Sequence, residues 1–223
     1  SSAYWETLEN ETLRPRPFGR FLARIKLFIN GTGLWRTSFV FANWTLESGE
    51  SLSIDPDTST FYPTDDTFAF NNYPDTNYGS ETFLGVENNV NGQYTEIAYL
   101  KFGISSLPAG TVISSATLSL YPYNAGGTGP YPVDIYTTSD DWDETTLTWN
   151  SQPARGSLVG SFTVNAGDWR YYSCDVTDYV SQEYADDKIV SFRVEADEEG
   201  DHIAFYSKDY SDSSKWPYLE ITY

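Results

Sequence analysis

The chain has 223 residues, of which 17% are aromatic, one is cysteine and none is methionine. A formal net charge of −19 excludes nucleic acid as an expected partner, because a phosphate backbone is bound by clustered lysine and arginine. The single cysteine, Cys174, excludes an intramolecular disulfide and a cysteine-based zinc site. No apolar run approaches the roughly 18 residues that a membrane span needs, so we expect no membrane span.

The first residue is Ser1, which indicates that something was removed in front of it. A cleaved signal peptide is the simplest explanation. We therefore expect a secreted, extracellular or cell-surface protein.

Residues 1–57 differ in charge from the rest of the chain. They hold six of the thirteen basic residues, all between Leu13 and Asn43, and seven of the thirty-two acidic ones. A strand is predicted here by alternation, with Arg24 and Lys26 on the face opposite to the apolar residues. The apolar face consists of Phe21, Ala23, Ile25, Leu27 and Ile29.

The turn sequence at 30–33 and a second strand from Leu34 to about Leu46 follow this first strand. Residues 51–54 are a further possible strand of a small meander. So small a sheet cannot bury enough apolar surface alone, so residues 1–57 are interpreted as a basic N-terminal strand extension for assembly. Three N-x-[ST] sequons, at Asn10, Asn30 and Asn43, are either glycosylation sites of an exported protein or ordinary turn asparagines.

From residue 58 onward, short β patterns alternate with Gly, Pro, Asn and Asp clusters. Nine strands are predicted, at 67–70, 97–102, 115–121, 132–138, 159–164, 170–175, 189–195, 202–207 and 218–223. One helix is expected at 177–183, with Asp175 or Thr177 as its N-cap. The fold class predicted is all-β: a jelly-roll β-sandwich over 58–223 with an N-terminal β-meander or strand extension.

Residues 65–223 resemble the disaggregatase-related repeat (DNRLRE) family nearly end to end. The matching phrases are DDTFAFNNYPDTNYGSETFLGV from Asp65, AYLKFGISSLPAGTVISSATLSLYPYN from Ala98, DDWDETTLTWNSQPARGSLVG from Asp140, WRYYSCDVTDYV from Trp169 and AFYSKDYSDSSKWPYLEITY from Ala204. The resemblance implies a jelly-roll domain of an exported archaeal or bacterial protein, related to alginate-type carbohydrate-binding modules.

The sequence predicts no enzyme. His202 is the only histidine, and no G-x-S-x-G or H-E-x-x-H motif occurs, so a Ser-His-Asp or zinc hydrolase is not expected. One acidic run has the carboxylate density of a hard-cation site, and calcium is the possible cofactor. Its carboxylates are Asp140, Asp141, Asp143 and Glu144. The alternative is a solvated loop that Trp142 anchors to the core.

Aromatic side chains in or near loops are possible glycan contacts, although most aromatic residues of this chain are expected in the core. The candidates are Tyr73, Tyr78, Tyr121, Tyr123, Tyr131, Tyr210 and Trp216.

Two functions fit the sequence. The first hypothesis is a structural subunit of an extracellular filament or layer, in which the N-terminal segment of one copy pairs with the next copy by strand addition. The alternative is a carbohydrate-binding or adhesive module whose partner is a surface polysaccharide. We expect neither a nucleic-acid nor a membrane partner.

Overall fold

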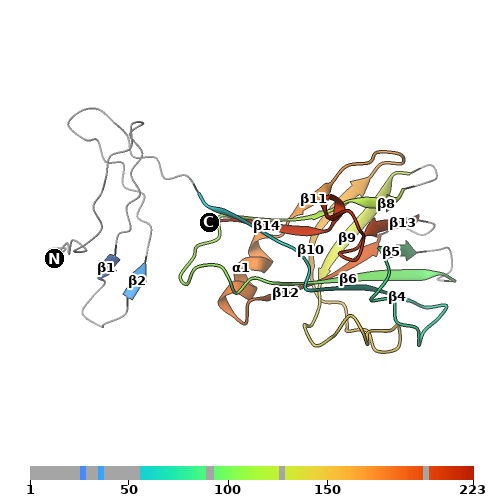
Figure 1. The fold of residues 1–223 in the computed structure, drawn as a ribbon, viewed down its shortest axis with the longest axis horizontal. Coiled ribbons are helices and arrows are strands. Elements are labelled where there is room, and N and C mark those ends of the chain that lie inside the picture. The colour runs from blue at the N-terminus through green and yellow to red at the C-terminus, as the bar shows by residue number, and fades with distance from the viewer. Residues whose placement is uncertain (1–25, 29–34, 38–55, 89–92, 126–128, 198–200) are drawn as a thin grey trace. The chain divides into compact units, whose positions relative to one another are not determined.

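The computed structural model describes residues 26–28, 35–37, 56–88, 93–125, 129–197 and 201–223 (Figure 1). The chain divides into two compact units. One comprises residues 1–57 with 109–111, and the other comprises Thr58–Pro108 with Val112–Tyr223.

The N-terminal unit contains an antiparallel pair of short strands, β1 (Lys26–Phe28) and β2 (Trp35–Thr37). Its register pairs Lys26 with Thr37 and Phe28 with Trp35. The predicted hairpin is thus confirmed for these three residue pairs. The other residues of the assembly strand, Phe21, Ala23, Arg24, Ile25 and Ile29, lie outside the described residues, as do the sequons at Asn10, Asn30 and Asn43 and the side chains of Lys26 and Leu27.

The larger unit is nearly all β, as predicted. An eight-stranded sheet has the order β10-β9-β12-β6-β5-β13-β8, with β4 on the other edge of β6, and a four-stranded sheet has the order β11-β7-β14-β3. The strands of the first sheet are β4 (Asp65–Phe70), β5 (Phe83–Asn88), β6 (Thr95–Gly103), β8 (Pro122–Asn124), β9 (Tyr131–Thr137), β10 (Leu158–Val164), β12 (Ile189–Ala196) and β13 (Asp201–Tyr206). Those of the second are β3 (Thr58–Phe61), β7 (Ser115–Leu120), β11 (Tyr172–Asp175) and β14 (Tyr218–Thr222).

The larger sheet curls at the junction of β5 and β6. These two strands share only two residue pairs, Glu87 with Glu96 and Asn88 with Thr95, whereas β6 pairs with β12 along six. On the other side, β8 follows β7 after a single residue, Tyr121, so one run of chain serves both sheets. These two features close the sheets into the predicted jelly-roll sandwich.

Alternation along the strands builds the core. In β13, Ile203 and Phe205 are fully buried and belong to one large apolar cluster, together with residues such as Leu118 of β7 and Ile221 of β14. A smaller cluster lies beneath the long 138–157 segment and includes Tyr99, Leu147 and Trp142. Trp142 is 9% exposed, so it anchors this segment to the core.

One helix, α1 (Thr177–Ala185), connects β11 to β12. Its N-cap position is Val176, which makes no side-chain cap, so the predicted cap at Asp175 or Thr177 is wrong by one residue. The Asp175 carboxylate nevertheless accepts a hydrogen bond from Thr177 N at 2.9 Å. No helix in the described part of the chain is long and apolar enough to cross a membrane.

Candidate functional site

Strands β5 and β13 share one face that lies opposite to their fully buried apolar side chains. Because side chains alternate along a strand, His202, Ala204 and Tyr206 lie on the face of β13 opposite to the buried Ile203 and Phe205. The antiparallel register then sets three pairs side by side on the outward face: His202 with Glu87, Ala204 with Gly85, and Tyr206 with Phe83. This outer face of β5 and β13 has a polar end and an aromatic end, and the middle between them, Ala204 with Gly85, is buried.

The aromatic end is a set of rings in direct contact. Tyr123 of β8 stacks on Phe83 with the centroids 5.4 Å apart and meets Tyr206 edge-on at 5.2 Å. Tyr210 lies 4.2 Å from Tyr206. Tyr123 is 44% exposed, whereas Phe83, Tyr206 and Tyr210 are partly buried, so the group is open to solvent mainly at Tyr123. Flat, solvent-facing rings with phenol groups can stack on an apolar surface and donate hydrogen bonds at the same time.

A lysine lies over these rings. The Lys215 ammonium is 4.9 Å from the centroid of Tyr206 and 5.7 Å from that of Tyr210. A short 3₁₀ turn, η2 (Ser213–Lys215), carries it, and Asp212 caps this turn by accepting a hydrogen bond from Ser214 N at 3.1 Å. The cation is therefore held in place by cation–π contacts and by a capped turn.

Further aromatic residues extend this surface toward β14 and β3. Tyr121 meets Tyr171 edge-on at 5.2 Å, and Trp216 meets Tyr62 at 5.8 Å. The Trp216 indole donates to the Tyr210 carbonyl at 2.7 Å. The strip of aromatic residues thus reaches from β5 across the sheet that contains β14.

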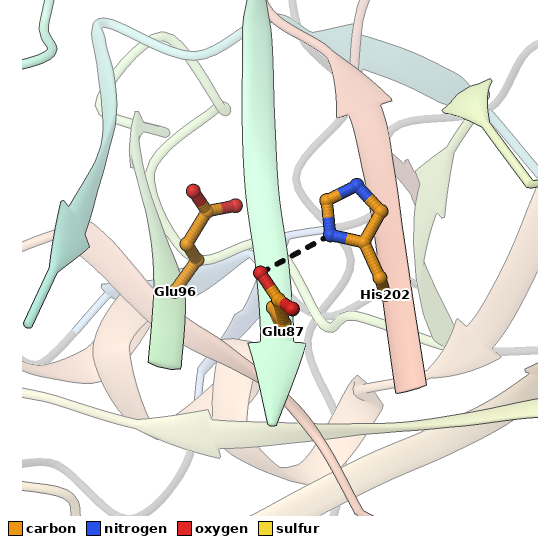
Figure 2. Close-up of side chains that lie close together, drawn as sticks. All are labelled: Glu87, Glu96 and His202. Atoms are coloured by element: carbon orange, nitrogen blue, oxygen red, sulfur yellow. Dashed lines mark ion pairs between the residues drawn. The ribbon is translucent and has the colours of Figure 1, made fainter. Parts of the chain in front are cut away.

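The polar end consists of Glu87, Glu96 and His202, on the neighbouring strands β5, β6 and β13 (Figure 2). His202 Nδ1 lies 3.3 Å from Glu87 Oε2. Glu96 lies across Gly85: a Cβ on that glycine would be 2.0 Å from Glu96 Oε2. Burial raises the pKa of Glu96 to about 7, with Glu87 acting in the same direction and His202 against it.

The residues predicted as glycan contacts lie in different parts of the structure. Tyr123, Tyr210, Trp216 and Tyr121 lie in the aromatic strip. Tyr78 stacks on Phe68 at 4.4 Å, and the charge of Glu96 helps to raise its pKa after the larger effect of burial, so it lies near the polar end. Tyr73 is 57% exposed in the turn after β4.

Tyr131 requires a correction. It is 5% exposed and belongs to the core cluster, because β9 alternates with Tyr131, Val133 and Ile135 facing inward. A ligand cannot reach it.

The four carboxylates of the predicted calcium loop do not converge. Asp140 lies with Glu183 and Asp187, whereas Glu144 lies with Asp66 and Asp209. Lys208 is within the second group, with its ammonium 2.8 Å from Glu144 Oε2. Asp143 instead caps the backbone at Thr145 N at 2.8 Å, and Asp141 is exposed.

Sequence reasoning missed Tyr206, Phe83, Lys215, Glu87 and Glu96. Tyr206 could have been found, because it lies in the predicted strand 202–207 at the position that alternates with the buried Phe205. No sequence pattern predicts that Glu96 and His202 are neighbours, because the order of β6, β5 and β13 in the sheet brings them together.

The fold and this face define a protein of the carbohydrate-binding-module type: a curled jelly-roll sandwich with exposed aromatic rings on one face. Residues 57–223 match carbohydrate-binding module family 96, and the chain belongs to this family. The relation to carbohydrate-binding modules implied by the sequence is thereby confirmed, whereas the DNRLRE assignment stays a prediction.

Curated relatives include the tRNA nuclease WapA of Bacillus subtilis strain 168, 27% identical over 185 residues, and the tRNA3(Ser)-specific nuclease WapA of Bacillus spizizenii, 28% identical over 183 residues. In both cases the match covers 77% of this chain and 8% of the relative, so this chain spans a small part of those proteins. Among solved structures, xylanase 10B of Clostridium thermocellum, comprising CBM22-1 and GH10 modules with xylohexaose, is 18% identical with a TM-score of 0.34, covering 73% of this chain and 28% of that one.

Proposed function

We propose that this chain is a non-catalytic carbohydrate-binding module of an exported protein, and that its polysaccharide ligand lies on the aromatic end of the β5–β13 face. The observation that carries the proposal is a set of tyrosine rings in contact: Tyr123, which is exposed, meets the partly buried Tyr206, which meets Tyr210, and the Lys215 ammonium lies over the last two. Family membership supports the same class of function.

The chemistry of this surface fits a sugar chain. A pyranose ring presents C–H groups on its faces and hydroxyls around its edge. Tyrosine rings cover the first by stacking, and their phenol groups and the Lys215 ammonium hydrogen-bond the second. Because the rings also contact one another, little conformational freedom is lost when a ligand binds.

The test is binding of the full chain to a panel of neutral and uronate polysaccharides, by affinity electrophoresis and then calorimetry. Loss of one stacking ring, in Tyr123→Ala or Tyr206→Ala, should weaken binding about 2- to 12-fold, since such contacts are worth about 0.5–1.5 kcal/mol. The matched control is Tyr136→Ala, a tyrosine of β9 that contacts Arg155 and Asp134 instead. Binding that is unchanged in both strip variants, or absent for every polysaccharide, would contradict the proposal.

The filament hypothesis is less well supported than this alternative. Family membership favours carbohydrate binding, and the side chains of the predicted assembly strand lie outside the described residues. Self-association through residues 1–29 stays a prediction. Light scattering of the full chain and of a chain lacking these residues would test it. If residues 1–29 join the copies, the full chain should form oligomers and the shortened chain should be a monomer.

A further inference from the structure

The polar end of the β5–β13 face has an arrangement that carbohydrate stacking does not explain. Glu96, Glu87 and His202 follow one another across three adjacent strands, because the register pairs Glu96 with Glu87 and Glu87 with His202 (Figure 2). Two glutamates directly opposite each other repel and destabilise a strand pair. The fold nevertheless places both on the same face.

We propose that Glu87, Glu96 and His202 form a binding site for a divalent transition-metal ion, with Zn²⁺ as the representative ion. Imidazole together with carboxylate oxygen is a donor set suited to such ions. In the deprotonated forms that bind a metal, the two carboxylates and the imidazole together carry a charge of −2, which one divalent cation neutralises. With the metal bound, both glutamates are attracted to the same cation, which offsets the repulsion between them.

The distances fit this site. Bonds of about 2.0–2.1 Å in a tetrahedral zinc site place neighbouring ligand atoms about 3.3–3.4 Å apart. His202 Nδ1 and Glu87 Oε2 are already 3.3 Å apart. Atoms from all three side chains lie within 4.8 Å of one another, so Glu96 has to approach by at most about 1.4 Å, a movement that a change of its side-chain torsions supplies.

Gly85 leaves room for the Glu96 carboxylate beside this site. The position of its absent Cβ lies 2.0 Å from Glu96 Oε2 and 2.7 Å from the Glu96 carboxyl carbon. A larger residue there would force the carboxylate away. The site rests on three strands instead of loops, which holds the ligands in place before the metal binds.

The acidic group of Asp140, Glu183 and Asp187 provides an internal control. It has the same number of ligand residues, whose ligand atoms also lie within 4.8 Å of one another, but all three are carboxylates. A site that owes its affinity to imidazole and carboxylate together should be distinguishable from a surface that simply concentrates negative charge.

The experiment uses the full chain, freed of metal by chelator and dialysis. Calorimetric titration with ZnCl₂ should show one site per chain, and Co²⁺ should give visible d–d absorption of a low-coordinate complex. His202→Ala and Glu96→Gln should each weaken Zn²⁺ binding at least 10-fold. Gly85→Ala should also weaken it, although it removes no ligand. Glu183→Gln should leave it unchanged.

His202 is half exposed, so its removal does not open the core, and His202→Gln serves as a second variant of similar size. Circular dichroism establishes that each variant is folded. The proposal is overturned if the chain binds no Zn²⁺, if Ca²⁺ binds this site more tightly than Zn²⁺, or if both His202 variants bind like the parent chain. These readouts use metal alone, so they are independent of whether any polysaccharide binds.

Discussion

Asp66 should make the protein less stable as the pH rises from acid to neutral. Its side chain is at the start of β4 and the residue is 1% exposed. One carboxylate oxygen accepts a hydrogen bond from Lys208 N at 2.7 Å, whereas Oδ1 has no partner among the described residues. Burial outweighs the Lys208 hydrogen bond and charge and raises the pKa of Asp66 to about 7.

The sign follows from proton uptake. The carboxyl has its ordinary pKa of 3.8 in the unfolded chain, so between about pH 4 and pH 7 the folded state binds more protons. The free energy of unfolding therefore falls as the pH rises through this window. The difference between the two pKa values corresponds to a loss of about 4 kcal/mol in the free energy of unfolding by the time the pH exceeds 7.

Urea denaturation followed by tryptophan fluorescence, at each pH from 4 to 8, measures this change. The Asp66→Asn variant lacks the titrating carboxyl, so its free energy of unfolding should fall less between pH 4 and pH 8 than that of the parent chain. A smaller fall should remain, because the pKa of Glu96 is also raised to about 7 and acts in the same direction. Asp141→Asn removes an exposed aspartate and should reproduce the parent curve. If Asp66→Asn loses as much stability between pH 4 and 8 as the parent does, the reasoning from burial is refuted.

Three further predictions concern the sandwich itself. Burial raises the pKa of the Cys174 thiol to about 12, so a thiol reagent at pH 8 should react with the unfolded chain and leave the folded one untouched; rapid labelling without denaturant would contradict this. Phe205→Ala removes a fully buried ring and should lower the free energy of unfolding by about 3–5 kcal/mol in urea, unless the core collapses around it. Gly79→Ala would place a Cβ 2.0 Å from the Glu144 backbone oxygen and should cost about 1–3 kcal/mol; an unchanged midpoint would show that the segment shifts freely.

Local sequence patterns predicted most of the sandwich but not all of it. Strands such as β6 and β12 were predicted because their apolar residues alternate. Strand β5 was missed, because Gly85 at its centre and Glu87 near its end are poor strand formers by propensity. The structure shows why glycine is present: the carboxylate of Glu96 takes up the space of its side chain. The contact with Glu96 therefore requires a glycine at position 85, and that glycine weakens the sequence pattern of the strand.

The aromatic part of the site was more predictable than the polar part. Tyr123 and Tyr210 were found because exposed rings near loops are a recognisable class. The grouping of Glu87, Glu96 and His202 depends on the order of strands distant in sequence, and a local pattern contains no such information. The acidic run at 140–144 shows the converse, since carboxylates that are close together in sequence, such as Asp140 and Glu144, have different neighbours in space.

The first and last strands of the sandwich, β3 and β14, are neighbours, and this has a mechanical consequence. Thr58 pairs with Thr222 at one end of the antiparallel ladder, and their hydroxyl oxygens are 3.3 Å apart. Tension between segments attached before Thr58 and after Thr222 would pull this pair apart sideways, so the ladder bonds would open one after another instead of sharing the load. A module bound to a polysaccharide in flow would then yield first at this seam, while the β5–β13 face, which lies on other strands, keeps its shape.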